Sequence, residues 1–474
     1  MKKSCFCFLL ILCVLLCAFP AAAFADSGER LQAGDHIDYG VFQDKPVCWL
    51  VLDPEHQNTG DPGAFLLTQY VVQGSGVYYN WDYAIWKGSL GQEWCTDFAQ
   101  TAFSDAERAM IPAVDKQEEP VTAYGLMWGT ADLEQEQVFF LSTRECMEYI
   151  APEDGGPGLS GYTEDGTLVY WWFRTPHGTH PDYAGLVLDM DQVHDNLVMY
   201  GWGGRPATNL DLDRVILLIP SEGEGAPVGE LNAPRRPEDG RWKAIVPDES
   251  RALRITAAEK DGRDLLLHYA GAVPGEGSYL SLLACDEEGR ELLYGRLAAC
   301  TEEEGELLLS QSMGLPEGAR LYLFNEQEGG EHRSNLSSPL CPVNCTLTIS
   351  AGAGSGSMEA LNLPYGSSFT LPESGFTPPE GQVFDHWELN DRPVDGAEAL
   401  IVSGDGVLTA VYRGEDEAPK ASGAPVSSSG SVAVDTVRNL SAVSTVTKVL
   451  ILGVPLLLIV LVLFLAINSG RRRR

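Results

Sequence analysis

The sequence predicts a multidomain, β-rich protein that ends in a transmembrane helix. Short runs of aliphatic and aromatic residues alternate with turn residues, and the chain contains 50 Gly and 28 Pro. This pattern is typical of several small β domains. Two stretches with few large apolar side chains, 221–240 and 414–447, separate these runs as linkers do. Long apolar segments also stand near both ends of the chain.

The N-terminal segment has the features of a secretory signal peptide. Lys2 and Lys3 precede an apolar run, and residues 23–25 read Ala-Phe-Ala, which fits the A-x-A pattern of a cleavage site. We therefore expect residues 1–25 to be removed and the exported chain to begin at Asp26.

The segment 448–468 predicts a single spanning helix. Its stretch 449–467 is uncharged and apolar, and at about 1.5 Å per residue it is long enough to cross a hydrocarbon core about 30 Å thick. The tail 469–474 contains four arginines, which the positive-inside rule places in the cytoplasm. The sequence thus predicts a single-pass protein of a bacterial cell membrane, with the N-terminus outside and 414–447 as a stalk.

Charge and cysteine content limit the classes of partner and fold. The formal net charge is −35, so the chain repels nucleic acid and anionic lipid, and we expect no nucleic-acid partner. Of the 11 cysteines, four leave with the signal peptide. The odd number that remains is not typical of a small secreted disulfide framework, and the sequence does not define any connectivity.

The first predicted domain, 26–220, reads as an α+β module with antiparallel strands. Short runs such as 36–42 and 47–52 have the composition of strands. Residues 90–103 read as a helix, and two S-x-x-E capping boxes, which begin at Ser104 and Ser142, predict short helices.

Four motifs of this domain occur in a fixed order. They are Val47-Cys48-Trp49-Leu50-Val51-Leu52, Phe139-Phe140-Leu141-Ser142, Trp171-Trp172-Phe173-Arg174 and Gly203-Gly204-Arg205-Pro206-Ala207. The series resembles a family of uncharacterised domains in exported bacterial proteins of Firmicutes type, which carry W-W-L-R-S and G-V-R-P-A motifs. That resemblance implies a fold related to C-type lectins and to the formylglycine-generating enzyme. Phe173, Thr175 and Gly204 depart from the usual Leu, Ser and Val.

The remaining two modules also resemble known domains. Residues 241–341 alternate like an Ig-like β-sandwich and resemble the companion domain that often follows the first. Residues 342–413 resemble the internalin B-type repeat of bacterial surface proteins, with Phe384-Asp385-His386-Trp387 among the matching residues. That resemblance implies a compact β-grasp-like unit with Trp387 in its core.

Candidate ligand-binding residues lie in the second half of the first domain. They are Trp172, Arg174, His177, His180 and Arg205. An aromatic face beside a guanidinium suits a sugar. However, alternation along a strand puts Trp172 and Arg174 on one face and their neighbours on the other, so one of the two faces is core. Packing with an internal hydrogen bond of Arg174 therefore competes with a ligand face.

The loop that follows also contains candidate metal ligands. Asp189, Asp191 and Asp195 would supply oxygen ligands if calcium binds. The competing interpretation is that loops are polar and that Asp189-x-Asp191 only caps a hairpin. No other cofactor is expected.

Two classes of function agree with these observations. The first is a non-catalytic cell-surface protein for binding or adhesion, with an extracellular glycan or protein as its ligand. The second is a cell-surface enzyme with unrecognised chemistry in 26–220. The G-x-S-x-G, P-loop and H-E-x-x-H motifs do not occur in the sequence, which favours the first class.

Overall fold

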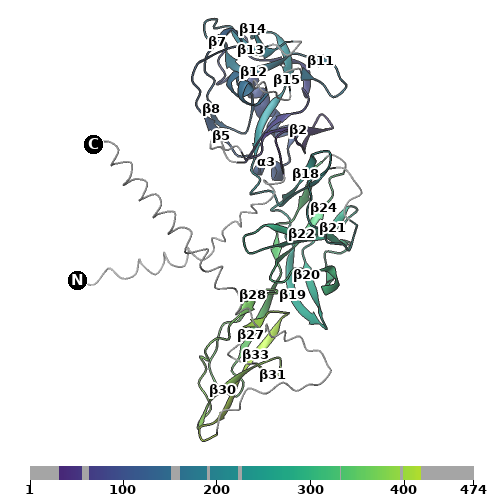
Figure 1. Cartoon of the computed structure of the whole chain (residues 1–474), viewed down its shortest axis with the longest axis vertical. Helices are drawn as coiled ribbons and strands as arrows, with labels where there is room; N and C mark the ends of the chain where they lie inside the picture. The colour runs from purple at the N-terminus through teal and green to yellow at the C-terminus, as the bar shows by residue number, and fades with distance from the viewer. Residues whose placement is uncertain are drawn as a thin grey trace, which may run out of the picture. The chain divides into compact units, whose positions relative to one another are not determined.

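The structure of the chain is a computed structural model, which describes residues 31–55, 63–150, 158, 161–188, 193–221, 227–330, 333–394 and 399–417. It is β-rich, with 49% strand and 8% helix arranged in several sheets (Figure 1), as the sequence predicts. The predicted signal peptide, spanning helix and Arg tail, and nearly all of the stalk, lie outside the described residues. Within the described parts, no helix is both long and apolar enough to cross a membrane.

In its described residues, the first region combines many short strands with three α-helices and a π-helical turn. Its elements are β1 (His36–Phe42), β2 (Lys45–Asp53), β3 (Ala64–Thr68), β4 (Gln73–Tyr78), α2 (Leu90–Ala102), α3 (Asp105–Ala109), β5 (Val114–Lys116), β6 (Val121–Ala123), β7 (Leu126–Trp128), β8 (Leu133–Glu136), β9 (Val138–Phe140), α4 (Thr143–Glu145), the π-helical turn η1 (Cys146–Ile150), β10 (Gly161–Tyr162), β11 (Leu168–Val169), β12 (Trp171–Pro176), β13 (Tyr183–Val187), β14 (Val193–Leu197), β15 (Gly201–Gly204), β16 (Pro206–Leu210) and β17 (Leu217–Pro220).

Local sequence signals set these elements. Gln43 and Asp44 join β1 to β2, and both have positive φ (51° and 64°). They form a two-residue hairpin turn, whose backbone twist matches that of the flanking strands. Ser89 caps α2, because its hydroxyl accepts a hydrogen bond from the Gln92 amide at 3.0 Å. The predicted helix 90–103 is confirmed to within one residue, and both predicted capping boxes are present at α3 and α4.

Two sheets organise the first region. The larger contains β9, β16, β3, β2 and β1 in that order, and continues from β1 into β18. The smaller has the order β14-β13-β12-β15-β4. In the core, Trp49 of β2 packs against Phe98 of α2, with ring centroids 6.3 Å apart.

The second region is built almost entirely from longer strands. Its elements are β18 (Arg241–Pro247), β19 (Arg254–Asp261), β20 (Asp264–Ala270), β21 (Ser278–Cys285), β22 (Glu291–Ala299), β23 (Glu304–Leu309), the 3-10 turn η2 (Gln311–Met313), β24 (Arg320–Gln327), β25 (Asn335–Ser337) and β26 (Cys341–Pro342). Strands β19, β20 and β23 form a sheet of their own, whereas the large sheet runs on through β25, β24, β21 and β22.

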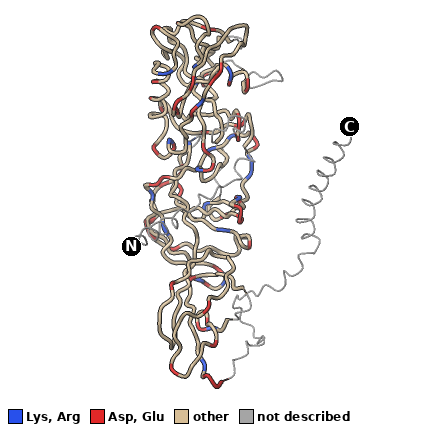
Figure 2. The backbone as a smooth tube through the Cα atoms, turned by 90° about the vertical axis from the view of Figure 1, so that its left-hand side faces the viewer, with Lys and Arg blue, Asp and Glu red and all other residues tan. Residues whose placement is uncertain are grey.

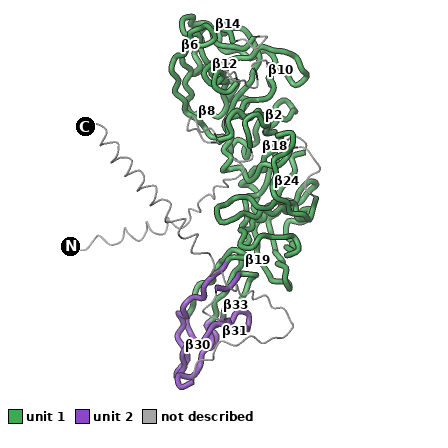
Figure 3. Tube along the Cα trace, viewed as in Figure 1, with its two compact units in different colours: residues 1–350, 357–367, 402–408 green, residues 351–356, 368–401, 409–474 purple. Residues whose placement is uncertain are grey.

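Strand β18 connects the first two regions. It lies parallel to both β1 and β25 and antiparallel to β17. Its side chains alternate between two cores, since Trp242 packs in the core of the first region and Ile245 in that of the second. The predicted linker also makes contacts, because Asn232 exchanges two backbone hydrogen bonds of 2.9 Å with Tyr294. The predicted boundary at 221–240 therefore falls inside one compact unit (Figure 3).

The last region contains β27 (Asn344–Ser350), β28 (Leu361–Pro364), β29 (Ser368–Phe369), β30 (Gln382–Leu389), β31 (Arg392–Val394), β32 (Leu400–Ile401) and β33 (Gly406–Gly414). Part of it, including 368–401, forms a second compact unit. In that unit Trp387 is buried against Phe376 and Phe384, and its indole nitrogen donates to the Pro372 carbonyl at 2.9 Å. The expectation that Trp387 is a core residue is confirmed.

Acidic residues are widely distributed, and the described cysteines are unpaired. Acidic positions are distributed along the whole described chain (Figure 2). The seven cysteines outside the predicted signal peptide are all free thiols.

Candidate functional site

Trp172 lies in the interior of the first region. Its side chain has no exposed surface, and its indole nitrogen donates to the Val77 carbonyl at 2.8 Å. The ring also packs edge-on against Tyr79 at a centroid distance of 5.9 Å. Trp172 therefore offers no face to a ligand in this conformation.

Arg174 lies at the centre of a buried network of charges. Its guanidinium donates to Glu145 Oε2 and to Glu118 Oε1, each at 2.6 Å. It also donates to the carbonyls of Ala131 at 3.0 Å and Phe140 at 2.7 Å. Burial alone would raise the pKa of Glu145, but the charges of Arg174 and Lys116 hold it well below its ordinary value. Of the two interpretations of Arg174 that the sequence allows, the structure therefore shows the internal hydrogen bonding and not a ligand face.

Arg205 is likewise buried. Its Nε donates to the Thr68 carbonyl at 3.0 Å, and its guanidinium lies 4.9 Å from the centre of the Trp171 ring. Burial lowers the pKa of Arg205 to about 10, and no ion pair among the residues that the structure describes includes this arginine. The Arg205 side chain therefore lies inside the first region and does not face a ligand.

The two candidate histidines and Asp195 come together at the surface. One ligand atom from each of His177, His180 and Asp195 lies within 4.8 Å of the others, and His177 Nε2 is 3.9 Å from Asp195 Oδ2. Asp189 and Asp191 lie outside the described residues. The structure thus brings together three of the predicted residues.

The hydrogen bonds of His177 limit what this cluster can bind. The backbone amides of Thr179 and His180 both donate to His177 Nδ1 at 3.1 Å. Because Nδ1 is an acceptor, the proton of the neutral ring is on Nε2, on the side of Asp195. A metal on Nε2 would require that proton to move to Nδ1, where it would face two N–H donors. In this conformation His177 therefore stabilises the turn 177–180 rather than offering a metal ligand.

A group of aromatic side chains, exposed except for the partly buried Trp202, lies close to this turn, because the Ala84 amide donates to the Pro181 carbonyl at 2.7 Å. We call Tyr78, Trp81, Tyr83, Tyr200 and Trp202 the aromatic surface. Tyr78 and Trp81 are in contact with ring centroids 5.0 Å apart, and Tyr200 packs on Trp202 at 6.2 Å. Gly201 pairs with Tyr78 across the strands β15 and β4, which brings Tyr200 and Trp202 close to Tyr78 and Trp81. Trp81 and Tyr83 keep 58% and 59% of their surface exposed.

Comparison with known proteins gives one match. Residues 62–212 match a family described as a domain of unknown function, DUF6273. The matched segment contains every predicted site residue and the aromatic surface, together with three of the four sequence motifs. No curated protein matches the chain. No solved structure matches it either.

Sequence reasoning did not find the aromatic surface of the DUF6273 segment. The signal was present, because Tyr78-Tyr79-Asn80-Trp81-Asp82-Tyr83 concentrates four aromatic residues in six positions at the end of a strand. What the sequence does not show is that only Tyr79 of these four is fully buried. It also did not single out Glu136, a mostly buried carboxyl that lines a cavity.

Proposed function

We propose that the protein is a single-pass, membrane-anchored cell-surface protein that binds an extracellular ligand and catalyses no reaction. The aromatic surface is the observation that carries this proposal. Contiguous exposed apolar patches mark interaction sites, and Trp and Tyr dominate the energetics of binding sites. The candidates Trp172, Arg174 and Arg205 are buried, and in this proposal they pack the interior of the domain and do not contact the ligand.

The backbone that carries the aromatic surface is held in place. Asn80 accepts a hydrogen bond from the Trp81 amide and donates one to the Tyr83 carbonyl, both at 3.0 Å. The Asn80 and Ala84 amides donate to the carbonyls of Val198 and Pro181, at 3.2 and 2.7 Å. A loop ordered before binding loses less conformational entropy when a ligand arrives. This supports a preformed binding surface rather than a mobile connection.

The proposed ligand is a glycan or a protein. Exposed ring faces suit both the apolar face of a sugar and an anchor residue of a protein partner. A net charge of −35 disfavours strongly anionic ligands. No cofactor enters the proposal, and calcium bound by Asp189, Asp191 and Asp195 remains a separate hypothesis.

The proposed architecture agrees with such a role. We propose a C-type-lectin-like fold for 26–220, an Ig-like β-sandwich for 241–341 and an internalin B-type, β-grasp-like repeat for 342–413. A signal peptide, a stalk and the helix 448–468 would then hold these modules at the bacterial cell surface.

An enzyme is the alternative function, and one observation favours it. Burial raises the pKa of Glu136, and a carboxyl with a raised pKa in a cavity is one form that a general acid takes.

An array of glycans and extracellular proteins, probed with the purified chain, tests the proposal. We expect binding that the double substitution Trp81→Ala/Tyr83→Ala reduces by about tenfold or more, since it removes two anchor residues. Leu308→Ala is the matched control, because Leu308 is an exposed apolar residue of β23. Parallel screens for hydrolase and oxidase turnover address the alternative. Turnover in the absence of any binding would overturn the proposal.

A further inference from the structure

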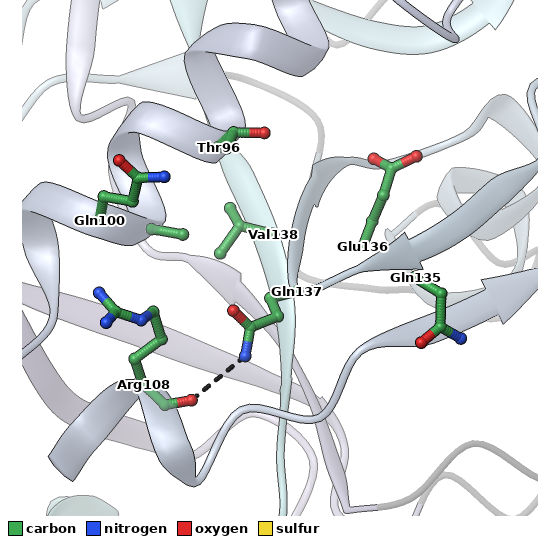
Figure 4. Close-up of a pocket in the computed structure, with 8 residues that line it drawn as sticks. Thr96, Gln100, Arg108, Gln135, Glu136, Gln137 and Val138 are labelled. Carbon is green, nitrogen blue, oxygen red and sulfur yellow. Dashed lines mark hydrogen bonds between the residues drawn. The ribbon is translucent and has the colours of Figure 1, made fainter. Parts of the chain in front are cut away.

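A cavity of about 470 Å³ lies between the helices and strands β8 and β9 of the first region. Its lining residues come from α2, α3 and the chain segment 135–138. They are Thr96, Ala99, Gln100, Arg108, Gln135, Glu136, Gln137 and Val138 (Figure 4). The volume is that of a site for a small ligand. The aromatic surface contributes none of these residues.

Glu136 is the only acidic side chain of this lining, and it keeps 9% of its surface exposed. Trp86 Nε1 donates to both carboxylate oxygens at 3.0 and 3.1 Å, and Gln92 Nε2 donates to Oε1 at 2.8 Å. Both donors are neutral. No ion pair among the described residues includes Glu136, because Arg174 pairs with Glu145 and Glu118 instead.

Burial of a carboxylate without a cation is unfavourable, and the pKa of Glu136 reflects this. Burial raises it, although the bonds from Gln92 and Trp86 and the more distant charge of Arg174 each lower it. Structures rarely retain an uncompensated buried charge unless a partner satisfies it. A cationic group in the cavity would supply that partner.

Gln137 adds an acceptor to this lining. The Gln137 amide nitrogen already donates to the carbonyls of Arg108 at 3.2 Å and Ile111 at 2.5 Å, so its oxygen remains available (Figure 4). The Gln135 amide nitrogen donates to Asp115, and this side chain points away from the Glu136 carboxylate (Figure 4). The positive charge of Arg108 is offset by Asp105 at 2.5 Å. Glu136 and the Gln137 amide oxygen can therefore both accept hydrogen bonds from a ligand that carries N–H donors.

We infer that this cavity binds the ammonium group of a small organic cation, with Glu136 as its counter-ion and the amide oxygen of Gln137 as a further acceptor. Such a ligand would include a free amine or a lysine-like side chain. Calcium suits the site less well, because that ion takes six to eight oxygen ligands and usually several carboxylates.

Calorimetric titration of the purified full-length chain with 1,5-diaminopentane and with lysine amide tests the inference. We expect binding of both amines. Glu136→Gln should weaken it about thirtyfold or more, as loss of one partner of a buried charge pair does, while the new amide oxygen still accepts from Trp86. Glu134→Gln is the matched control, because it removes the same charge from an exposed residue of β8, and it should leave affinity within about twofold.

Thr96→Trp provides a second variant if Glu136→Gln does not fold. Thr96 is exposed at the edge of the cavity, so the larger side chain should block entry without disturbing the core. Absence of amine binding by the unaltered chain would overturn the inference. The inference would also be overturned if Glu136→Gln and Glu134→Gln lost the same amount of affinity for the amines. Undiminished amine binding by Thr96→Trp would overturn it as well.

Discussion

Arg174 and Glu145 form an ion pair of 2.6 Å in which the arginine has no exposed surface. The two residues lie on different elements, the strand β12 and the short helix α4. Glu145 also closes the capping box of α4, because its carboxylate accepts from the Ser142 amide at 2.9 Å. One carboxylate thus stabilises the start of a helix and fixes that helix against the strand.

Replacement of Arg174 by methionine should strongly destabilise the first region. The apolar side chain fills similar space but leaves Glu145 and Glu118 buried without their main cation. Removal of one partner from a buried ion pair costs about 3–5 kcal/mol. Urea unfolding followed by tryptophan fluorescence measures the change. Arg263→Met is the control, because Arg263 is exposed in the turn between β19 and β20, and it should cost about 0.5 kcal/mol or less. Similar unfolding midpoints for the two variants would contradict the network.

Stability should also fall in acid through Glu145. Its pKa in the folded chain lies below the unfolded value of about 4.3. The stabilisation is therefore fully present above the unfolded pKa and is lost as the pH falls through 4 toward the lower folded value. The urea concentration at the unfolding midpoint should fall as the pH is lowered from 6 to 3. This fall should be less steep for Glu145→Gln than for the unaltered chain. Glu136→Gln should change the slope in the opposite direction, because the folded pKa of Glu136 is raised.

The shared strand β18 predicts that the first two regions stabilise each other. A fragment 26–222 lacks the strand that pairs with β1 and β17, and it exposes the contacts that Trp242 makes. We expect this fragment to unfold at a lower urea concentration than a fragment 26–343. In the longer fragment, Trp242→Ala should cost about 3–5 kcal/mol and lower the midpoint of both regions together. Independent transitions with unchanged midpoints would instead support the boundary at 221–240.

The sequence predicts local features of this fold better than their long-range partners. The helix α2 and both capping boxes follow from residues close together in the chain, and these predictions are confirmed. The parallel pairing of β18 with β1 joins Arg241 to His36, and no local pattern specifies such a contact. The composition of 221–240 predicts a linker because it lacks large apolar residues. Its backbone nevertheless hydrogen-bonds to β22, which depends on the fold and not on composition.

The candidate site shows the same division. Alternation along β12 predicts one buried face, but every residue from Trp171 to Thr175 is buried, and the pairing with β13 is irregular between Trp172 and Pro176. The contact of His177 with Asp195 depends on the pairing of β13 with β14, in which Gly185 lies opposite Asp195. The sequence therefore identified residues that lie close together but not the roles that their surroundings give them.

The turn 177–180 leads to a last prediction, which separates a structural role of His177 from metal binding. His177 Nδ1 accepts hydrogen bonds from two backbone amides, and an asparagine side-chain oxygen can take the same position. His177→Asn should thus retain nearly all of the stability, whereas His177→Ala should lose about 1–3 kcal/mol because two amides lose their acceptor.

Thermal unfolding with millimolar zinc or calcium, and with a chelator, supplies the second measurement. If His177 stabilises the turn as described, zinc leaves the melting temperature of the unaltered chain unchanged. A rise with zinc that His177→Asn abolishes would show instead that His177, His180 and Asp195 bind the ion. A rise with calcium alone that Asp195→Asn abolishes would support the calcium hypothesis for Asp189, Asp191 and Asp195.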